Sequence, residues 1–268
     1  MKEKIASIFY LKMFFFGAFI IVIGAIIFRL GAEIAQSSFT NNSFSLLLVS
    51  RDSKLIFVDK QAKSVRFISI GDIRRYAKGK STLGVSIALG IPINGMMISD
   101  FNIKNLNDFM GSDNEMKLIS DNSITRKNVN RYDIFKIMNA IRGFPKDNRK
   151  EIKLNIFDQK DVKDMLEGAF LDSAINNLEY TVEIENATSI DGLGSIFALI
   201  LTSEGYNVIA VRTSEEKGNS YIAYPTSSDV YINSLINLTK FDHNKVKKSP
   251  TSDVTIFLGE ELDAMLSP

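Results

Sequence analysis

The sequence contains no cysteine and only one histidine, His243, among its 268 residues. The absence of cysteine excludes disulfides, thiolate nucleophiles and Cys-ligated metals. A single imidazole also excludes every metal site that needs two histidine ligands. Any chemistry must therefore use carboxylates, hydroxyls, lysines or arginines, and the motifs indicate neither a metal ion nor another cofactor.

An excess of charge of either sign is also missing. The chain has 32 Lys and Arg against 31 Asp and Glu, which gives a formal net charge of +1. Nucleic acid binding needs a concentrated basic surface, so we expect no nucleic acid partner. The 45% of hydrophobic and 24% of charged residues are typical of a folded globular protein with one large or two small domains.

One long hydrophobic run lies near the N-terminus. Residues 13–28 carry no charge and are bracketed by Lys12 and Arg29. At about 1.5 Å per residue the run covers ~24 Å, and the two long basic side chains extend it to the ~30 Å core of a bilayer. The sequence therefore predicts a transmembrane helix over residues 13–30 that contacts membrane lipid. A cleavable signal peptide is the alternative, but residues 30–36 contain no A-x-A site.

The basic residues around this run predict its orientation. Lys2, Lys4 and Lys12 precede it, whereas Arg29 alone follows it before Arg51. Under the positive-inside rule, residues 1–12 form a cytoplasmic tail and the rest of the chain lies outside. We therefore expect a single-pass plasma-membrane protein with extracytoplasmic domains, joined to the membrane by a polar tether at residues 31–43.

Two folded segments follow the tether. In residues 44–177, β-rich runs predict strands at 45–49, 55–58, 65–70 and 93–99. Helical spacing predicts helices at 82–89, 134–141 and 162–170, the last with Asp158 as its N-cap. In residues 178–264, strands are expected at 180–184, 208–211, 221–224 and 254–258, and helices at 193–201 and 232–236. The expected fold class is α/β (α+β): an N-terminal transmembrane helix and two small layered αβ domains.

Motifs for nucleotide binding and acid–base catalysis fail on inspection. Gly79-Lys80-Ser81 resembles the end of a P-loop, but Arg74 stands where its first glycine belongs. Gly192-Leu193-Gly194 lacks the third glycine of a dinucleotide fingerprint, because Phe197 occupies that position. His243 lies among polar residues after a helical pattern, which predicts a solvated turn and not a catalytic base.

The C-terminal segment carries four short motifs in a fixed order: VEIENAT at 182–188, GLG at 192–194, GYNV at 205–208 and DVTIFLG at 253–259. Together they resemble the C-terminal domain of LytR/CpsA/Psr envelope proteins, over residues 179–262. Ala187 departs from that family's usual glycine, and Gly194 from its usual alanine. The resemblance implies structural roles for Asn186, Thr188, Gly192, Leu193, Gly205, Val208, Leu258 and Gly259.

The middle segment is similar to the catalytic LytR/CpsA/Psr domain, through DKQAKSVRFISI at 59–70 and LGIPI at 89–93. That family moves wall polymers from a polyprenyl-pyrophosphate carrier, with arginines on the pyrophosphate and acids on a divalent metal. Residues 69–73 read Ser-Ile-Gly-Asp-Ile in place of the family's Ser-Ile-Pro-Arg-Asp, so Asp72 stands where a phosphate-binding arginine is expected. Repulsion between Asp72 and a phosphate argues against catalysis.

These observations lead to one main hypothesis and two alternatives. The main one is a non-catalytic binding or scaffolding factor in the assembly of cell-wall polymers. The first alternative is an active phosphotransferase in which Arg51, Arg74 and Arg75 replace the lost arginines, the latter two on a surface loop. The second is an envelope sensor or assembly factor that binds another protein. Convergence of these arginines with acids on one cleft would favour the phosphotransferase.

Overall fold

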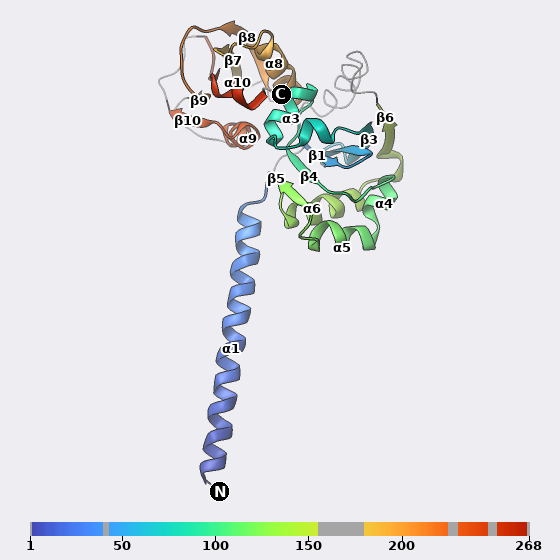
Figure 1. Ribbon diagram of the computed structural model, residues 1–268, viewed down its shortest axis with the longest axis vertical. Coiled ribbons are helices and arrows are strands. Elements are labelled where there is room, and N and C mark those ends of the chain that lie inside the picture. The colour runs from blue at the N-terminus through green and yellow to red at the C-terminus, as the bar shows by residue number, and fades with distance from the viewer. Residues whose placement is uncertain (1, 40–42, 155–179, 225–229, 246–250, 267–268) are drawn as a thin grey trace.

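The computed structural model describes residues 2–39, 43–154, 180–224, 230–245 and 251–266 (Figure 1). The predicted helix at 162–170 and its N-cap Asp158 lie outside these residues. The described part consists of a long N-terminal helix and two units, each built on its own sheet. The expected fold class, mixed α/β with two sheets and one N-terminal apolar helix, is confirmed.

Helix α1 (Lys2–Ala35) extends away from the two units, and the large apolar side chains between Met13 and Phe28 are exposed (Figure 1). Its segment Met13–Ala35 has a mean hydropathy of 2.5 and is long enough to cross a membrane. The helix continues to Ala35, past residue 31, where the polar tether was expected to begin. Ser37 and Phe39, further along the expected tether, are bound to the first unit.

The first sheet has the strand order β5-β4-β1-β2-β3-β6. Its strands are β1 (Ser43–Val49), β2 (Ser53–Asp59), β3 (Ser64–Gly71), β4 (Gly95–Ile98), β5 (Thr125–Lys127) and β6 (Arg149–Lys153). β1, β2 and β3 form an antiparallel meander, and β4 and β6 add in parallel to β1 and β3. The four strands predicted in this unit are confirmed.

Helices cover both faces of this sheet because successive strand residues point to opposite sides. On one face, Leu46 and Leu48 pack with the helices α4 (Leu106–Met110), α5 (Ser112–Ser120) and α6 (Arg131–Arg142). On the other face, Leu47 and Val49 pack with α2 (Arg74–Ala77) and α3 (Thr82–Leu89). Arg74 and Arg75 therefore lie on a short helix, not on the predicted loop.

The second sheet has the order β10-β9-β11-β7-β8. Its strands are β7 (Thr181–Asn186), β8 (Asn207–Thr213), β9 (Tyr221–Tyr224), β10 (Asp242–Lys245) and β11 (Val254–Leu258), and its helices are α8 (Leu193–Ser203), α9 (Val230–Thr239) and α10 (Glu261–Leu266). The elements predicted here are confirmed, but His243 is not in a turn. It lies on edge strand β10, where its ring stacks with Tyr224 at 6.2 Å between centroids.

The two units share part of one hydrophobic core. Leu83 and Ile87 belong to α3 of the first unit, yet both are buried among apolar side chains of the second, including Phe197 and Leu262. Helices α3 and α8 are in contact along this boundary. α3 thus packs on its own sheet and on the second unit at the same time.

Candidate functional site

A cleft of about 630 Å³ lies at one edge of the first sheet, and we call it the edge cleft. The strands β1, β3, β4 and β6 all end at this edge because they run in the same direction. Ligands of open α/β sheets bind beyond the carboxyl ends of such strands. The lining residues are Arg74, Lys78, Gly79, Ile98, Ser99, Asp100, Phe101, Asp121, Ser123, Thr125 and Lys127.

The arginine of this cleft is already paired with an acid. Asp72 accepts hydrogen bonds from Nε of Arg74 at 2.9 Å and from its Nη2 at 2.5 Å. These bonds lower the pKa of Asp72 to about 2 and raise the pKa of Arg74. Asp72 therefore pairs with the guanidinium of Arg74 and supplies no cation of its own to the cleft.

The other charged groups of the cleft are of both signs. Nζ of Lys127 donates to the backbone oxygen of Lys80, so one of its donors is used inside the protein. Lys78 is exposed, and Asp100 brings an opposing negative charge. Asp121 accepts from the backbone N–H of Ser123 at 2.7 Å, and hydrogen bonds from this serine lower the pKa of the carboxyl.

The acids of the cleft do not form a metal site of the kind that the family resemblance implies. Across the described residues, no three His, Cys, Asp or Glu side chains gather closely enough to hold a metal ion. We therefore assign no metal ligands and derive no metal-dependent step.

The three arginines of the phosphotransferase hypothesis do not converge. Arg74 lines the edge cleft, whereas Arg75 lines a neighbouring hollow of about 880 Å³ beside Met265 and Leu266, and the two share Lys78 and Gly79 in their linings. Arg51 is exposed in the turn between β1 and β2 and lines neither hollow. The arrangement needed to bind a pyrophosphate with several guanidinium groups is thus not present at these positions.

A buried cation that the sequence motifs did not indicate lies near the same edge. The side chain of Lys54 is 2% exposed, and its Nζ donates to Asp52 at 2.5 Å and to Oγ of Ser69 at 2.6 Å. Ser69 opens the segment that resembles the family's Ser-Ile-Pro-Arg-Asp motif. A signal was present, because Lys54 is the only charge inside the run SKLIFV. Two of its three donors are thus used inside the protein, and Asp52 offsets its charge.

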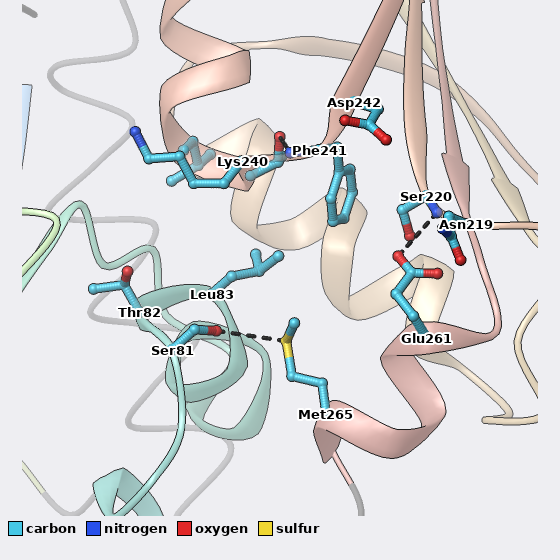
Figure 2. A pocket seen from close by; sticks show the side chains of 12 residues that line it. Ser81, Thr82, Leu83, Asn219, Ser220, Lys240, Phe241, Asp242, Glu261 and Met265 are labelled. Carbon is cyan, nitrogen blue, oxygen red and sulfur yellow. Dashed lines mark hydrogen bonds between the residues drawn. The ribbon is translucent and has the colours of Figure 1, made fainter.

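A third hollow, of about 310 Å³, lies between the two units (Figure 2). Figure 2 shows Leu83 and Met265 on one side of it and Phe241 on the other. Glu261 borders the hollow and accepts from the backbone N–H of Ser220 at 2.9 Å through Oε1. Its Oε2 is buried and has no hydrogen-bond partner in the described part of the chain. Apolar side chains of both units, Leu83 from the first and Phe241 and Met265 from the second, meet in this hollow.

The motif residues of the second unit shape its turns. Asn186 accepts from the backbone N–H of Thr188 at 3.2 Å and from its hydroxyl at 2.7 Å, which closes the turn after β7. Gly192 and Gly205 flank α8 with φ of +78° and +92°, a region that favours glycine. The other motif residues lie as follows: Leu193 and Leu258 are buried, Val208 packs against the core, and Gly259 follows β11.

Residues 179–261 match the sequence model of the LytR_C family, described as LytR cell envelope-related transcriptional attenuator. The predicted resemblance of this segment to the C-terminal domain of LytR-type proteins is therefore confirmed. The match covers about a third of the chain, so the likeness of the first unit to a catalytic LytR/CpsA/Psr domain stays a prediction. No curated protein matches the sequence.

Two solved structures from Listeria show weak similarity. The Lin1025 protein of Listeria innocua is 15% identical, with 75% of this chain and 98% of that chain covered and a TM-score of 0.19. The Lmo1026 protein of Listeria monocytogenes is 14% identical, with 84% and 92% covered and a TM-score of 0.19. Because both scores are so low, we draw nothing from either structure.

Proposed function

We propose that this protein is a membrane-anchored binding factor of the cell envelope, which holds cell-wall polymer in its edge cleft without turning it over. The LytR_C domain supports the link to the envelope, and α1 supports the anchor. The observation that carries the absence of turnover is the pairing of Arg74 with Asp72.

The charge balance of the cleft supports a polymer ligand over a pyrophosphate. A pyrophosphate needs several cations that are free to bind its oxygens. In the edge cleft Arg74 is paired, Lys127 binds a backbone oxygen, and Asp100 and Asp121 add negative charge. Carboxylates and hydroxyls beside the ring of Phe101 instead offer acceptors and an apolar surface to a hydroxyl-rich chain.

The proposed topology places the N-terminus in the cytoplasm and both units outside. It rests on the excess of basic residues before residues 13–28. External protease on intact cells is expected to digest both units and to spare a tag at Met1. A protected C-terminus would contradict this orientation.

The proposed ligand can be tested with the full chain in lipid nanodiscs and purified cell-wall polymer. We expect saturable binding that Asp100→Ala weakens about tenfold, because hydrogen bonds to a charged group contribute about 1.5–3 kcal/mol. Asp147→Ala is the matched control, since Asp147 is an exposed aspartate on the short 3-10 helix Lys146–Asn148, outside the cleft. Equal binding by both variants would refute the cleft as the site, and no binding at all would favour an envelope protein as the partner.

A further inference from the structure

The end of α1 is fastened directly to the first turn of α6. Nδ2 of Asn130 donates to the backbone oxygen of Glu33 at 2.7 Å. Asp133 is fully buried and accepts from the hydroxyl of Ser37 at 2.5 Å and from the backbone N–H groups of Ser38 and Phe39 at 3.2 and 3.1 Å. The chain that leaves α1 is thus bound to the first unit from its last helical turn onward.

This attachment fixes the height of α6 above the membrane. Glu33 follows Arg29 by one helical turn, which is about 6 Å along the axis. Arg29 ends the uncharged run, and its guanidinium belongs among the lipid headgroups. The headgroup layer is about 5–8 Å thick on each side of the hydrocarbon core. The first turn of α6 therefore lies at the level of the headgroups or just above them.

The outer face of α5 and α6 is composed as a lipid-facing surface. The inward residues of α6, among them Ile134, Ile137 and Met138, are fully buried, so Phe135 and Tyr132 lie on other faces of the helix. Phe135 is 48% exposed, and Met116 on the neighbouring α5 is 63% exposed. Figure 1 shows α5 and α6 on the side of the first unit toward which α1 extends.

Basic side chains surround these apolar groups. Lys117 is exposed on α5, and Arg131 and Lys136 lie on α6. The acid Glu115 is paired with Arg142, and Asp121 accepts hydrogen bonds from Ser123. Lys136 donates to the backbone oxygen of Phe39 and Arg131 donates to Asn122, and Asp113 on α5 is an exposed acid. Lys117 is therefore the exposed cation of this face, and an exposed lysine near an exposed aromatic side chain favours an anionic membrane interface.

We propose that the outer face of α5 and α6, with Met116, Phe135 and Lys117, docks onto the surface of the bilayer and binds anionic lipid headgroups. This inference rests on the proposed membrane anchor. The occupant is the bilayer and not a second copy of the chain, because α1 holds this face at headgroup height in every molecule. Docking would leave the second unit as the part of the protein that extends farthest from the membrane.

The chain has no tryptophan, so single substitutions give clean fluorescent reporters. Three full-length variants are compared in vesicles of phosphatidylglycerol and phosphatidylcholine with brominated acyl chains: Phe16→Trp within the predicted span, Phe135→Trp on α6, and Ile209→Trp on β8. Ile209 is 46% exposed and serves as the matched control, because Figure 1 shows β8 at the end of the molecule opposite the N-terminus. We expect quenching of Phe16→Trp and Phe135→Trp but not of Ile209→Trp.

The outcomes separate the docking from the anchor. If Phe16→Trp is quenched while Phe135→Trp behaves like Ile209→Trp, the docking is refuted and the anchor stands. If Phe16→Trp is not quenched, the anchor itself fails. A change at Phe135→Trp that depends on the protein-to-lipid ratio would overturn the proposal in favour of a second copy.

The role of charge is tested in the Phe135→Trp background. Adding Lys117→Glu is expected to reduce the quenching by about half in vesicles that contain phosphatidylglycerol. Lys146→Glu is the matched control, because Lys146 is an exposed lysine on the 3-10 helix. Equal quenching in both double variants would refute the binding of anionic headgroups.

Discussion

Asn94 and Glu204 meet across the boundary between the two units, where Nδ2 of Asn94 donates to Oε1 of Glu204 at 3.5 Å. Asn94 is itself held in place, because its Oδ1 accepts from the backbone N–H of Ser45 at 2.7 Å. Burial raises the pKa of Glu204 to about 7, while the hydrogen bond from Asn94 acts in the opposite direction. The carboxyl is therefore protonated in the folded protein at mildly acidic pH.

This pKa predicts a pH-dependent stability. The folded value lies above the ordinary 4.5, so the folded state binds the proton more tightly than the unfolded state. The stability linked to the proton on Glu204 is fully present below pH 4.5. It is lost as the pH rises through 7, which lowers the free energy of unfolding by at most ~3 kcal/mol. We expect the full chain in detergent to unfold at a lower temperature at pH 8 than at pH 5.5.

Glu204→Gln is expected to remove most of this pH dependence and to raise the unfolding temperature at pH 8. Glu215→Gln changes an exposed glutamate in the loop after β8 and is the matched control. A Glu204→Gln protein that loses as much stability between pH 5.5 and 8 as the control would show that another group titrates.

Gly259 and Gly194 are expected to differ sharply in their tolerance of alanine. A Cβ at Gly259 would lie 2.2 Å from the backbone oxygen of Gly218, whereas a Cβ at Gly194 would meet Cγ1 of Val211 at 2.7 Å. Val211 is exposed and can move aside, but the backbone at Gly218 must shift. Gly259→Ala should cost about 1–3 kcal/mol in denaturant unfolding, and Gly194→Ala much less. Equal losses would contradict this account of the motif glycines.

The shared core predicts that a substitution in the first unit loosens the second. Leu83→Ala should lower the free energy of unfolding by about 2–5 kcal/mol, because it leaves a cavity among the side chains of the second unit. Leu89→Ala is the matched control, because Leu89 lies on the same helix but packs against the apolar side chains between that helix and the first sheet. Hydrogen exchange is expected to rise in α8 and β7 for Leu83→Ala only. Unchanged exchange there would show that the second unit does not depend on α3.

The central strands and core helices could be predicted from the sequence because they bury side chains in a regular pattern. The run from Ser43 to Val49 and the stripe from Leu193 to Leu201 each carry that pattern. The strands β5, β6 and β10 were missed, and all three lie at sheet edges. Edge strands such as Asp242–Lys245 bury little, so their sequences show no alternation.

The site could be predicted in less detail than the fold. The sequence identified Asp72 and Arg74 as unusual at their positions, but it did not predict that they pair with each other. Pairing depends on where the first turn of α2 directs each side chain, which spacing alone does not specify. Likewise, Lys54 and Asp133 are buried charges whose partners are up to 96 residues away in the sequence, and only the folded chain brings these groups together.

The most direct test of the central claim is the release of polyprenyl phosphate from a polyprenyl-pyrophosphate-linked polymer by the full chain in nanodiscs, with magnesium or manganese present. Because Arg74 is paired with Asp72 and the three candidate arginines do not line one common cleft, we predict a rate equal to that of empty nanodiscs. A rate clearly above that background, and abolished by Arg74→Ala or Arg75→Ala, would contradict a non-catalytic binding factor and establish the phosphotransferase.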